Sequence, residues 1–487
     1  MANGSQELNI AHATMHHDHE HWRILMSNSS INNFQEQPPY SFDQLMAEFK
    51  WLIKTLPDKR RGTNKSYSII DAALGAFAVF FMQFPSFLSH QSKMYAVKGI
   101  SNAQSLFQID KIPSDNQIRN LLDPIAPTKI TPMFDSVFNG LNSMGYFEHY
   151  RNTINKTVLI ALDGVNYFSS SKIHCNKCNV RRHKNGKIGY YHYAVTPVIV
   201  APKNPRVISL PPEFISPQPN YNKQDGEHAA VKRWLKEHGR KYKELKITIL
   251  GDDLYSHQPI CEAIKQEGFH FLLTCKPDSH TTLYAEVGSR ETAGDVKKMQ
   301  FKRITGIRVK KVMVDTYRFA NAVALRNTDD SLLVNWCELT TTNEADEIVF
   351  INSYITDHQI NSDNVIDVVN SGRTRWKIEN ENNNVLKNHG YNLEHNFGHG
   401  KCYLSQLLLT FNLLAFLFHT VLSIMDVKYQ TLREKLPTRK MFFDHIKALT
   451  TYLFFDNWDA LLQFMLDGLQ KRFEAKDLVS IYDSKID

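Results

Sequence analysis

The pattern of hydrophobic and polar positions divides the chain into six segments. Residues 1–66 are polar and rich in His, Asn and Ser, which predicts a flexible arm. Apolar positions become dense after that point. Three segments there combine a helical apolar pattern with flanking cap or proline residues: 68–84, 114–123 and 130–147. The pattern therefore predicts a helical domain over residues 67–150.

Between residues 151 and 296, short apolar runs alternate with a helical pattern. Two of the runs end on acidic residues, TVLIALDG (157–164) and KITILGDD (246–253). Further strands are expected over 187–202, 206–215 and 269–278. An amphipathic helix is expected over residues 227–242. This alternation predicts the first part of a core made of a mixed sheet covered by helices.

Residues 297–355 alternate between apolar and polar positions with a period of two, which predicts a β-rich insertion. Residues 356–440 are expected to complete the core, and residues 441–487 to form a C-terminal helical region. The predicted fold class is therefore α/β: a mixed sheet flanked by helices, with a β-rich insertion and an N-terminal helical domain.

One apolar run, LLLTFNLLAFLFHTVLSIM (407–425), has nearly the length of a membrane span. Asn412 and His419 interrupt it and no Lys/Arg cluster marks one side, so a helix buried on all sides is the preferred interpretation. The first residues lack the basic-then-apolar pattern of a signal peptide. The six cysteines are scattered, unlike a disulfide framework. We therefore expect a cytoplasmic protein.

The chain carries 57 Lys and Arg against 50 Asp and Glu, a net charge of +7. This excess suits a nucleic-acid partner without requiring one. Basic clusters interleaved with aromatic residues occur at 181–187, 232–246, 297–303 and 308–311. Each cluster alone is ordinary solvated surface, but together they suit a protein that holds a phosphate backbone.

Two predicted strands deliver an aspartate at their carboxyl ends, Asp163 in LIALD and Asp252 in TILGD, and a later helix carries Glu379. In open α/β sheets, chemistry gathers beyond the strand ends. Three carboxylates can hold two Mg²⁺ ions about 4 Å apart, an arrangement used for phosphodiester chemistry. Asp253 competes with Asp252 for the second position. Adjacent strand residues point to opposite sides, so only one of the two should reach the site.

Helical geometry separates the two glutamates of RWKIENENNNVLK. Arg375 and Glu379 are four residues apart and share a face. At about 100° per residue, Glu381 points some 200° away from Glu379. Glu379 is therefore the expected metal ligand, with Arg375 orienting it or binding phosphate and Lys387 contacting phosphate. Glu381 and residues 382–384 should be exposed or contact DNA.

These motifs resemble those of DDE transposases, the DNA-cutting and DNA-joining enzymes of bacterial insertion sequences. One branch of that superfamily has a strand-end D, a later D-x-x-Y, a β-rich insertion and a helical Y-x-x-R-x-x-x-E-x6-K. The corresponding residues here are Asp163 in LDGVNYF, Asp252 with Tyr255 in GDDLY, and Arg375 with Glu379 in RWKIE. The D-x-x-Y spacing of this resemblance selects Asp252 over Asp253, which is expected to cap the following turn. The wider run over about residues 60–470 is similar to a group of insertion-sequence transposases outside the major families.

Two positions depart from the family pattern. Gly372 stands where the pattern has tyrosine, and Lys387 lies one residue later than the pattern asks. Both departures lie at supporting positions of the motif and not at its acids. The supporting residues are Arg375, Lys387 and Tyr255, whereas the three acids match the pattern.

The resemblance implies an RNase H-like core in which Asp163, Asp252 and Glu379 bind Mg²⁺, with Mn²⁺ as a substitute. It also implies double-stranded DNA partners (element ends and target), binding of the ends by the helical domain, a homo-oligomer on DNA, and a nucleoid-associated location. A DNA nuclease without joining activity is the first alternative. A catalytically inactive, domesticated DNA-binding protein is the second, although retention of all three acids argues against it.

The segment HCNKC places Cys175 and Cys178 in C-x-x-C spacing, which suggests half of a structural zinc site. His174, His183 or His192 would complete it. A reduced turn without metal is the alternative, because four ligands at familiar spacing are absent from the sequence. A redox motif is disfavoured, since RRHKNGK replaces the helix that should follow.

Overall fold

The computed structural model describes residues 40–61, 65–217, 225–306, 310–436 and 438–470. These residues all belong to one compact unit, Tyr40–Asp487. Most of the predicted polar arm, residues 1–39 and 62–64, and the end of the predicted C-terminal region, residues 471–487, lie outside the described residues.

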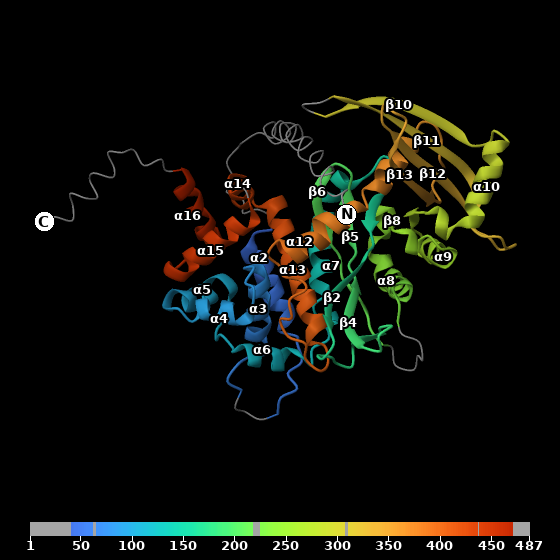
Figure 1. The fold of residues 1–487 in the computed structure, drawn as a ribbon. Coiled ribbons are helices and arrows are strands. Elements are labelled where there is room, and N and C mark those ends of the chain that lie inside the picture. Colours follow the sequence, from blue (N-terminus) through green and yellow to red (C-terminus); the bar gives the residue numbers. More distant parts are fainter. Residues whose placement is uncertain (1–39, 62–64, 218–224, 307–309, 437, 471–487) are drawn as a thin grey trace. The chain divides into compact units, whose positions relative to one another are not determined.

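A nine-stranded mixed sheet forms the centre of this unit, with the strand order β10-β11-β12-β13-β9-β8-β1-β5-β6 (Figure 1). Its strands are β1 (Val158–Ala161), β5 (Val198–Ala201), β6 (Asn204–Ser209), β8 (Ile247–Gly251), β9 (His270–Thr274), β10 (Lys297–Thr305), β11 (Lys311–Ala324), β12 (Leu333–Thr342) and β13 (Ile348–Thr356). β1 is parallel to β8, and β8 to β9, whereas β5 is antiparallel to β1. The predicted mixed α/β class is confirmed.

The four strands predicted as an insertion continue this same sheet. β13 pairs antiparallel with β9 through Tyr354–Thr356, and β12, β11 and β10 follow outward in turn. The insertion therefore widens the core sheet by four strands instead of forming a sheet of its own.

A smaller sheet branches from the centre. It contains β2 (Gly164–Ser170), β3 (Asn179–Arg182), β4 (Ile188–Val195) and β7 (Glu213–Ile215). The β1–β5 ladder ends at Ala161 and Val198, and the β2–β4 ladder begins at Gly164 and Val195. One antiparallel strand pair thus passes from the large sheet into the small one, and Asp163 lies at the crossing point.

Helices surround both sheets. The N-terminal helices are α2 (Phe42–Ile53), α3 (Ile69–Phe81), α4 (Phe87–Met94), α5 (Val97–Phe107), α6 (Asp115–Leu122) and α7 (Pro132–Ser143). Helices of the central region are α8 (Glu227–Tyr242), α9 (Gln258–Gln266), α10 (Thr281–Thr292), α11 (Val365–Arg373), the π-helix η6 (Ile378–Asn383) and α12 (Asn384–Asn388). The C-terminal helices are α13 (Leu404–Met425), α14 (Val427–Lys435), α15 (Arg439–Tyr452) and α16 (Trp458–Gln470).

Short 3-10 turns connect some of these elements: η1 (Pro127–Lys129), η2 (Tyr146–Tyr150), η3 (Lys243–Leu245), η4 (Asp253–Tyr255) and η5 (Pro277–Ser279). The predicted helices over 68–84, 114–123 and 130–147 correspond to α3, α6 and α7. Side chains of Ser68 and Ser114 cap the first two. The cap of α6 was predicted as Ser or Asp, and it is Ser114.

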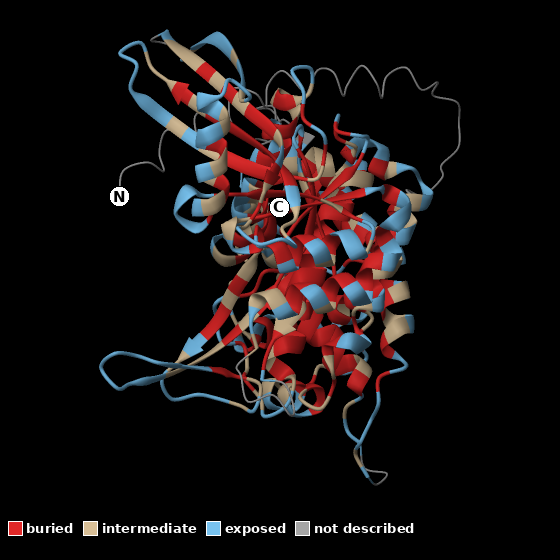
Figure 2. Cartoon of the chain, turned by 90° about the vertical axis from the view of Figure 1, so that its right-hand side faces the viewer, coloured by how far each residue is buried: buried red, intermediate tan, exposed pale blue. Residues whose placement is uncertain are grey.

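Within the described residues, α13 is the helix that is long and apolar enough to cross a membrane. It is instead a core helix, with 89% of its most apolar window buried. It packs against α2, α3, α6, α7, α14 and β6. Figure 2 shows the buried residues gathered where the helices and strands pack against one another. The preference for a buried helix over a membrane span is consistent with this packing.

The prediction of a polar arm up to residue 66 does not hold for α2. Phe42, Leu45, Met46, Phe49 and Ile53 of this helix are buried. Their spacing follows one helical face, while the polar positions between them resemble the composition of the preceding arm. Ser41 and Gln44 form a capping box at its start.

Candidate active site

Strand register brings the two predicted aspartates level with each other. β1 and β8 are parallel neighbours, with Ala161 opposite Leu250. Asp163 and Asp252 each follow two residues later, and Leu162 N still donates to Leu250 O at 2.9 Å. Adjacent strands lie about 4.8 Å apart, so the two carboxylates leave the same edge of the sheet side by side. The local reason is a buried apolar run that stops at each aspartate.

Asp163 is the most perturbed of the acids. Its Oδ2 accepts a hydrogen bond of 2.7 Å from Nδ2 of Asn383. The pKa of Asp163 is raised to about 7, mainly by burial; Arg375 lowers it, and Glu227, Glu379 and Asp252 add to the rise. The other two predicted acids and Arg375 therefore lie close enough to act on Asp163. Negative charge is in excess here, which is the condition that a bound cation relieves.

Asp252 and Asp253 diverge, as adjacent strand-end residues should. Asp252 Oδ1 accepts from Leu254 N at 3.0 Å and caps η4. Asp253 Oδ1 accepts from Lys276 N at 2.6 Å, and Oδ2 from the Ser279 hydroxyl. Asp253 therefore braces the turn after β9 rather than the turn that follows itself, which corrects the sequence interpretation. Asp252 raises the pKa of Asp163, which agrees with the expectation that Asp252 faces the site.

A fourth carboxylate, Glu227, joins the site without having been predicted there. It opens α8 and accepts a hydrogen bond from the Tyr255 hydroxyl. A Cβ atom on Gly164 would lie 2.5 Å from Glu227 Oε2, so only glycine allows this approach beside Asp163. The pKa of Tyr193 is raised to about 12, first by burial and then by Glu227, Asp163 and Asp252. Tyr255 thus supports the site through Glu227.

Glu379 lies on η6, close enough to Asp163 to raise its pKa. Its Oε1 lies 2.6 Å from Arg375 Nη2, the predicted i,i+4 pair, and half of its side chain remains exposed. Glu381 lies elsewhere: burial raises its pKa, and Lys377 and Arg439 lower it. The separation of the two glutamates expected from helical geometry is therefore present.

The prediction that residues 382–384 are exposed or contact DNA is wrong for two of the three asparagines. Asn382 and Asn383 are buried, whereas Asn384 is exposed as predicted. The cause is the π-helical turn, which closes i→i+5 hydrogen bonds and so rotates the following side chains. It turns the Asn383 amide onto Asp163.

The two departures from the family pattern have local explanations. A π turn takes about one more residue than an α turn, so η6 absorbs the extra residue before Lys387. The Lys387 ammonium pairs with Glu394 at 2.8 Å. At Gly372, a Cβ atom would approach the Tyr354 ring to 2.6 Å. The buried Tyr354 of β13 thus fills the space beside residue 372.

Lys377 is a buried cation that the sequence analysis did not single out. Its ammonium donates to the carbonyl oxygens of Ala201, Pro202 and Asn204, at 2.6, 3.0 and 2.6 Å. Burial lowers its pKa to about 8. These hydrogen bonds fasten the start of η6, the helix that carries Glu379, to the β5–β6 turn.

The carboxylates of the candidate site do not converge on one point. Within the described part of the chain, no three of these carboxylate oxygens lie within 4.8 Å of one another. A single ion held by all three acids is therefore not preformed.

The predicted cysteine site gathers one of the three histidines named for it, His192, together with the unpredicted His399. Cys175 and Cys178 lie with His192 and His399, and all four ligand atoms are within 4.8 Å. His174 instead stacks on Tyr190, with ring centroids 4.4 Å apart. His183 lies in the β3–β4 turn, where its backbone N–H donates to Lys187 O. The sequence analysis missed His399 because it is far away in the chain.

His270, Asp357 and His358 form a second close group. Hydrogen bonds account for it: His270 Nδ1 lies 2.9 Å from Asp357 Oδ2, and the His358 ring contacts Thr248 at 2.9 Å. Such a carboxylate–histidine network needs no metal.

Comparison with known proteins does not identify this chain: no family model matches it, and no curated protein matches it at a significant level.

Proposed function

We propose that this protein is a metal-dependent DNA transposase that cleaves the ends of a mobile element and joins them to target DNA. One observation carries the proposal: Asp163 and Asp252 end neighbouring parallel strands in register, and Glu379 acts on Asp163 from a later helix. The core order β6-β5-β1-β8-β9, followed by the helix that carries Glu379, supports an RNase H-like interpretation of the sheet.

Asp163, Asp252 and Glu379 would hold Mg²⁺ or Mn²⁺, with Glu227 beside them. When bound, two such ions would activate an attacking hydroxyl and stabilise the leaving oxygen of a phosphodiester. Asn383 holds Oδ2 of Asp163 and leaves Oδ1 for a ligand. Arg375 offsets part of the negative charge and carries N–H groups suited to a phosphate. Cutting and joining are both phosphoryl transfers, so one such site serves both.

The proposed substrate is double-stranded DNA, bound by a homo-oligomer in the cytoplasm at the nucleoid. The β3–β4 hairpin supports this, because Arg181, Arg182, Lys184 and Lys187 are all exposed on it. It belongs to the same small sheet as β2, which begins beside Asp163. The hairpin turn lies at the opposite end of β4 from Val195, the partner of Gly164. Exposed cations there attract a phosphate backbone, and binding by such contacts weakens steeply with salt.

A cell-based excision and integration assay tests the proposal, with the gene supplied beside its own flanking DNA. Glu379→Gln is expected to abolish both products, because it removes a ligand charge from the site. Glu381→Gln is the matched control, two residues away and directed at Lys377 and Arg439. It is expected to retain activity.

Other outcomes distinguish the alternatives. Cleavage without joining by the wild type would favour a nuclease. DNA binding without either reaction would favour an inactive, domesticated protein. Equal activity of Glu379→Gln and the wild type would remove the carboxylate site from the reaction altogether.

A further inference from the structure

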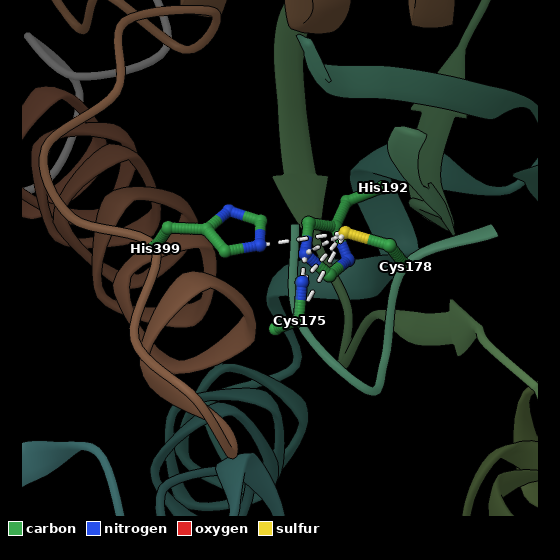
Figure 3. Close-up of side chains that lie close together, drawn as sticks. All are labelled: Cys175, Cys178, His192 and His399. Carbon is green, nitrogen blue, oxygen red and sulfur yellow. Dashed lines mark hydrogen bonds between the residues drawn. The ribbon is translucent and has the colours of Figure 1, made fainter. Parts of the chain in front are cut away.

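Four side chains from three separate segments meet at one point beside the small sheet (Figure 3). Cys175 and Cys178 come from the β2–β3 connection and His192 from β4. His399 comes from the segment before α13, more than 200 residues further along the chain. Figure 3 shows its ring reaching Cys178 from the side opposite the strands.

The distances within this cluster are those of a tetrahedral zinc site. The two sulfur atoms are 3.9 Å apart. Nε2 of His192 lies 3.5 Å from each sulfur, and Nε2 of His399 lies 3.4 Å from Cys178 Sγ. A tetrahedral ion with Zn–S of 2.3 Å and Zn–N near 2.0 Å places sulfurs about 3.8 Å apart and sulfur about 3.5 Å from nitrogen.

A disulfide does not explain the pair of cysteines. Bonded sulfurs lie about 2.05 Å apart, and both cysteines here are free thiols. Ordinary packing explains the cluster poorly as well, because Cys178, His192 and His399 are all buried with their polar atoms directed at one another. Two soft sulfurs and two imidazoles are the donor set that selects zinc.

We propose that Cys175, Cys178, His192 and His399 form a structural Zn²⁺ site. On binding, the two thiols release their protons and both histidines bind as neutral rings through Nε2, so the loaded site has no net charge. All four positions are filled by protein, which is typical of a structural site rather than a catalytic one.

The site fastens together two parts of the chain that flank the candidate active site. On one side, β2 and β4 lead directly to Asp163 and Thr196, where Thr196 N donates to Asp163 O at 3.0 Å. On the other side, the His399 segment continues from the helix that carries Glu379. The same segment is also held by α6, because Arg119 Nε donates to Phe397 O at 3.0 Å. Zinc would therefore brace the aspartate side against the glutamate side.

Metal analysis of the purified full-length protein tests this assignment. One equivalent of zinc per chain is expected for the wild type. Cys178→Ser and His399→Ala should each lose it, because either removes a ligand. Cys402→Ser and His395→Ala are matched controls, since both residues are exposed neighbours of His399 outside the cluster. These controls should keep a full equivalent.

A second measurement does not depend on variants that fold poorly. Cobalt exchanged into the wild type should give the intense visible bands of a tetrahedral ion with thiolate ligands, and His399→Cys should keep an equivalent of zinc with a shifted cobalt spectrum. Asp163→Asn should also keep zinc, which separates this site from the proposed carboxylate site. A wild-type protein without zinc, a Cys175–Cys178 disulfide in it, or zinc retained by both ligand variants would overturn the assignment.

Discussion

Replacing Asp163 by asparagine should make the metal-free protein more stable at pH 8. Burial raises the pKa of this carboxyl to about 7 in the folded state, against about 3.9 in an unfolded chain. The folded state therefore binds the proton more tightly than the unfolded state between about pH 4 and pH 7. Stability from this group is fully present below pH 4 and is lost as the pH rises through 7.

The size of the effect follows from the two pKa values. A rise from about 3.9 to about 7 on folding corresponds to up to about 4 kcal/mol of stability lost between pH 4 and pH 8. Asparagine has the same shape and no charge, and its carbonyl can still accept the Asn383 hydrogen bond. Asp163→Asn should therefore match the wild type near pH 4 and exceed it by a few kcal/mol at pH 8.

Urea denaturation across pH 4–8, in buffers without added divalent cation, measures this difference. Asp467→Asn, an exposed carboxylate on α16, is the control and should follow the wild type. Added Mg²⁺ at ten times its dissociation constant should stabilise the wild type by about 1.4 kcal/mol at pH 8, and the variant by much less. A parallel pH dependence of wild type and Asp163→Asn would refute the argument that Asp163 is held at a raised pKa.

Three further results are expected. Lys377→Met should reduce the free energy of unfolding by about 2–5 kcal/mol, because three carbonyls lose their donor. The control is Lys387→Met, which removes a partly exposed ion pair. It should lose less than about 1 kcal/mol in the same urea titration. Asp123→Ala should lose about 1–2 kcal/mol and the hydrogen-exchange protection at the start of α13, since its carboxylate accepts the backbone N–H groups there; unchanged protection would contradict this role. Arg181→Ser with Arg182→Ser should weaken DNA binding and lower the salt slope of the binding constant by about one to two, measured by fluorescence anisotropy, whereas an unchanged slope would place the DNA elsewhere.

Local patterns in the sequence were sufficient to predict the strands of the large sheet and the two strand-end aspartates, but not β2 and β3 of the small sheet. An apolar run that stops at an acid is visible within eight residues, and its position in the sheet follows from general rules of α/β topology. The Arg375–Glu379 pair was predictable for the same reason, because its spacing is that of one helical face.

The rest depended on contacts between distant segments. Glu227 opens a helix, where acidic residues are common for reasons of helix capping and dipole alone, so its approach to Gly164 had no signal in the sequence. His399 lies far from the C-x-x-C pair, and familiar metal spacings concern nearby residues. The π turn arises in an asparagine-rich run whose composition does not distinguish it from an α turn. α2 was missed because composition was given more weight than the spacing of its apolar residues.

The burial of α13 has a consequence for how the chain is made. The N-terminal helices α2, α3, α6 and α7 bury their apolar faces against a helix that begins only at Leu404. During synthesis, those faces leave the ribosome some 300 residues before their partner. The N-terminal region therefore cannot complete its core as each segment emerges, which is how successive domains usually fold. It can complete its core only after the last fifth of the polypeptide has been made. A chain cut short before α13 would leave these apolar faces exposed, as a target for chaperones and proteases.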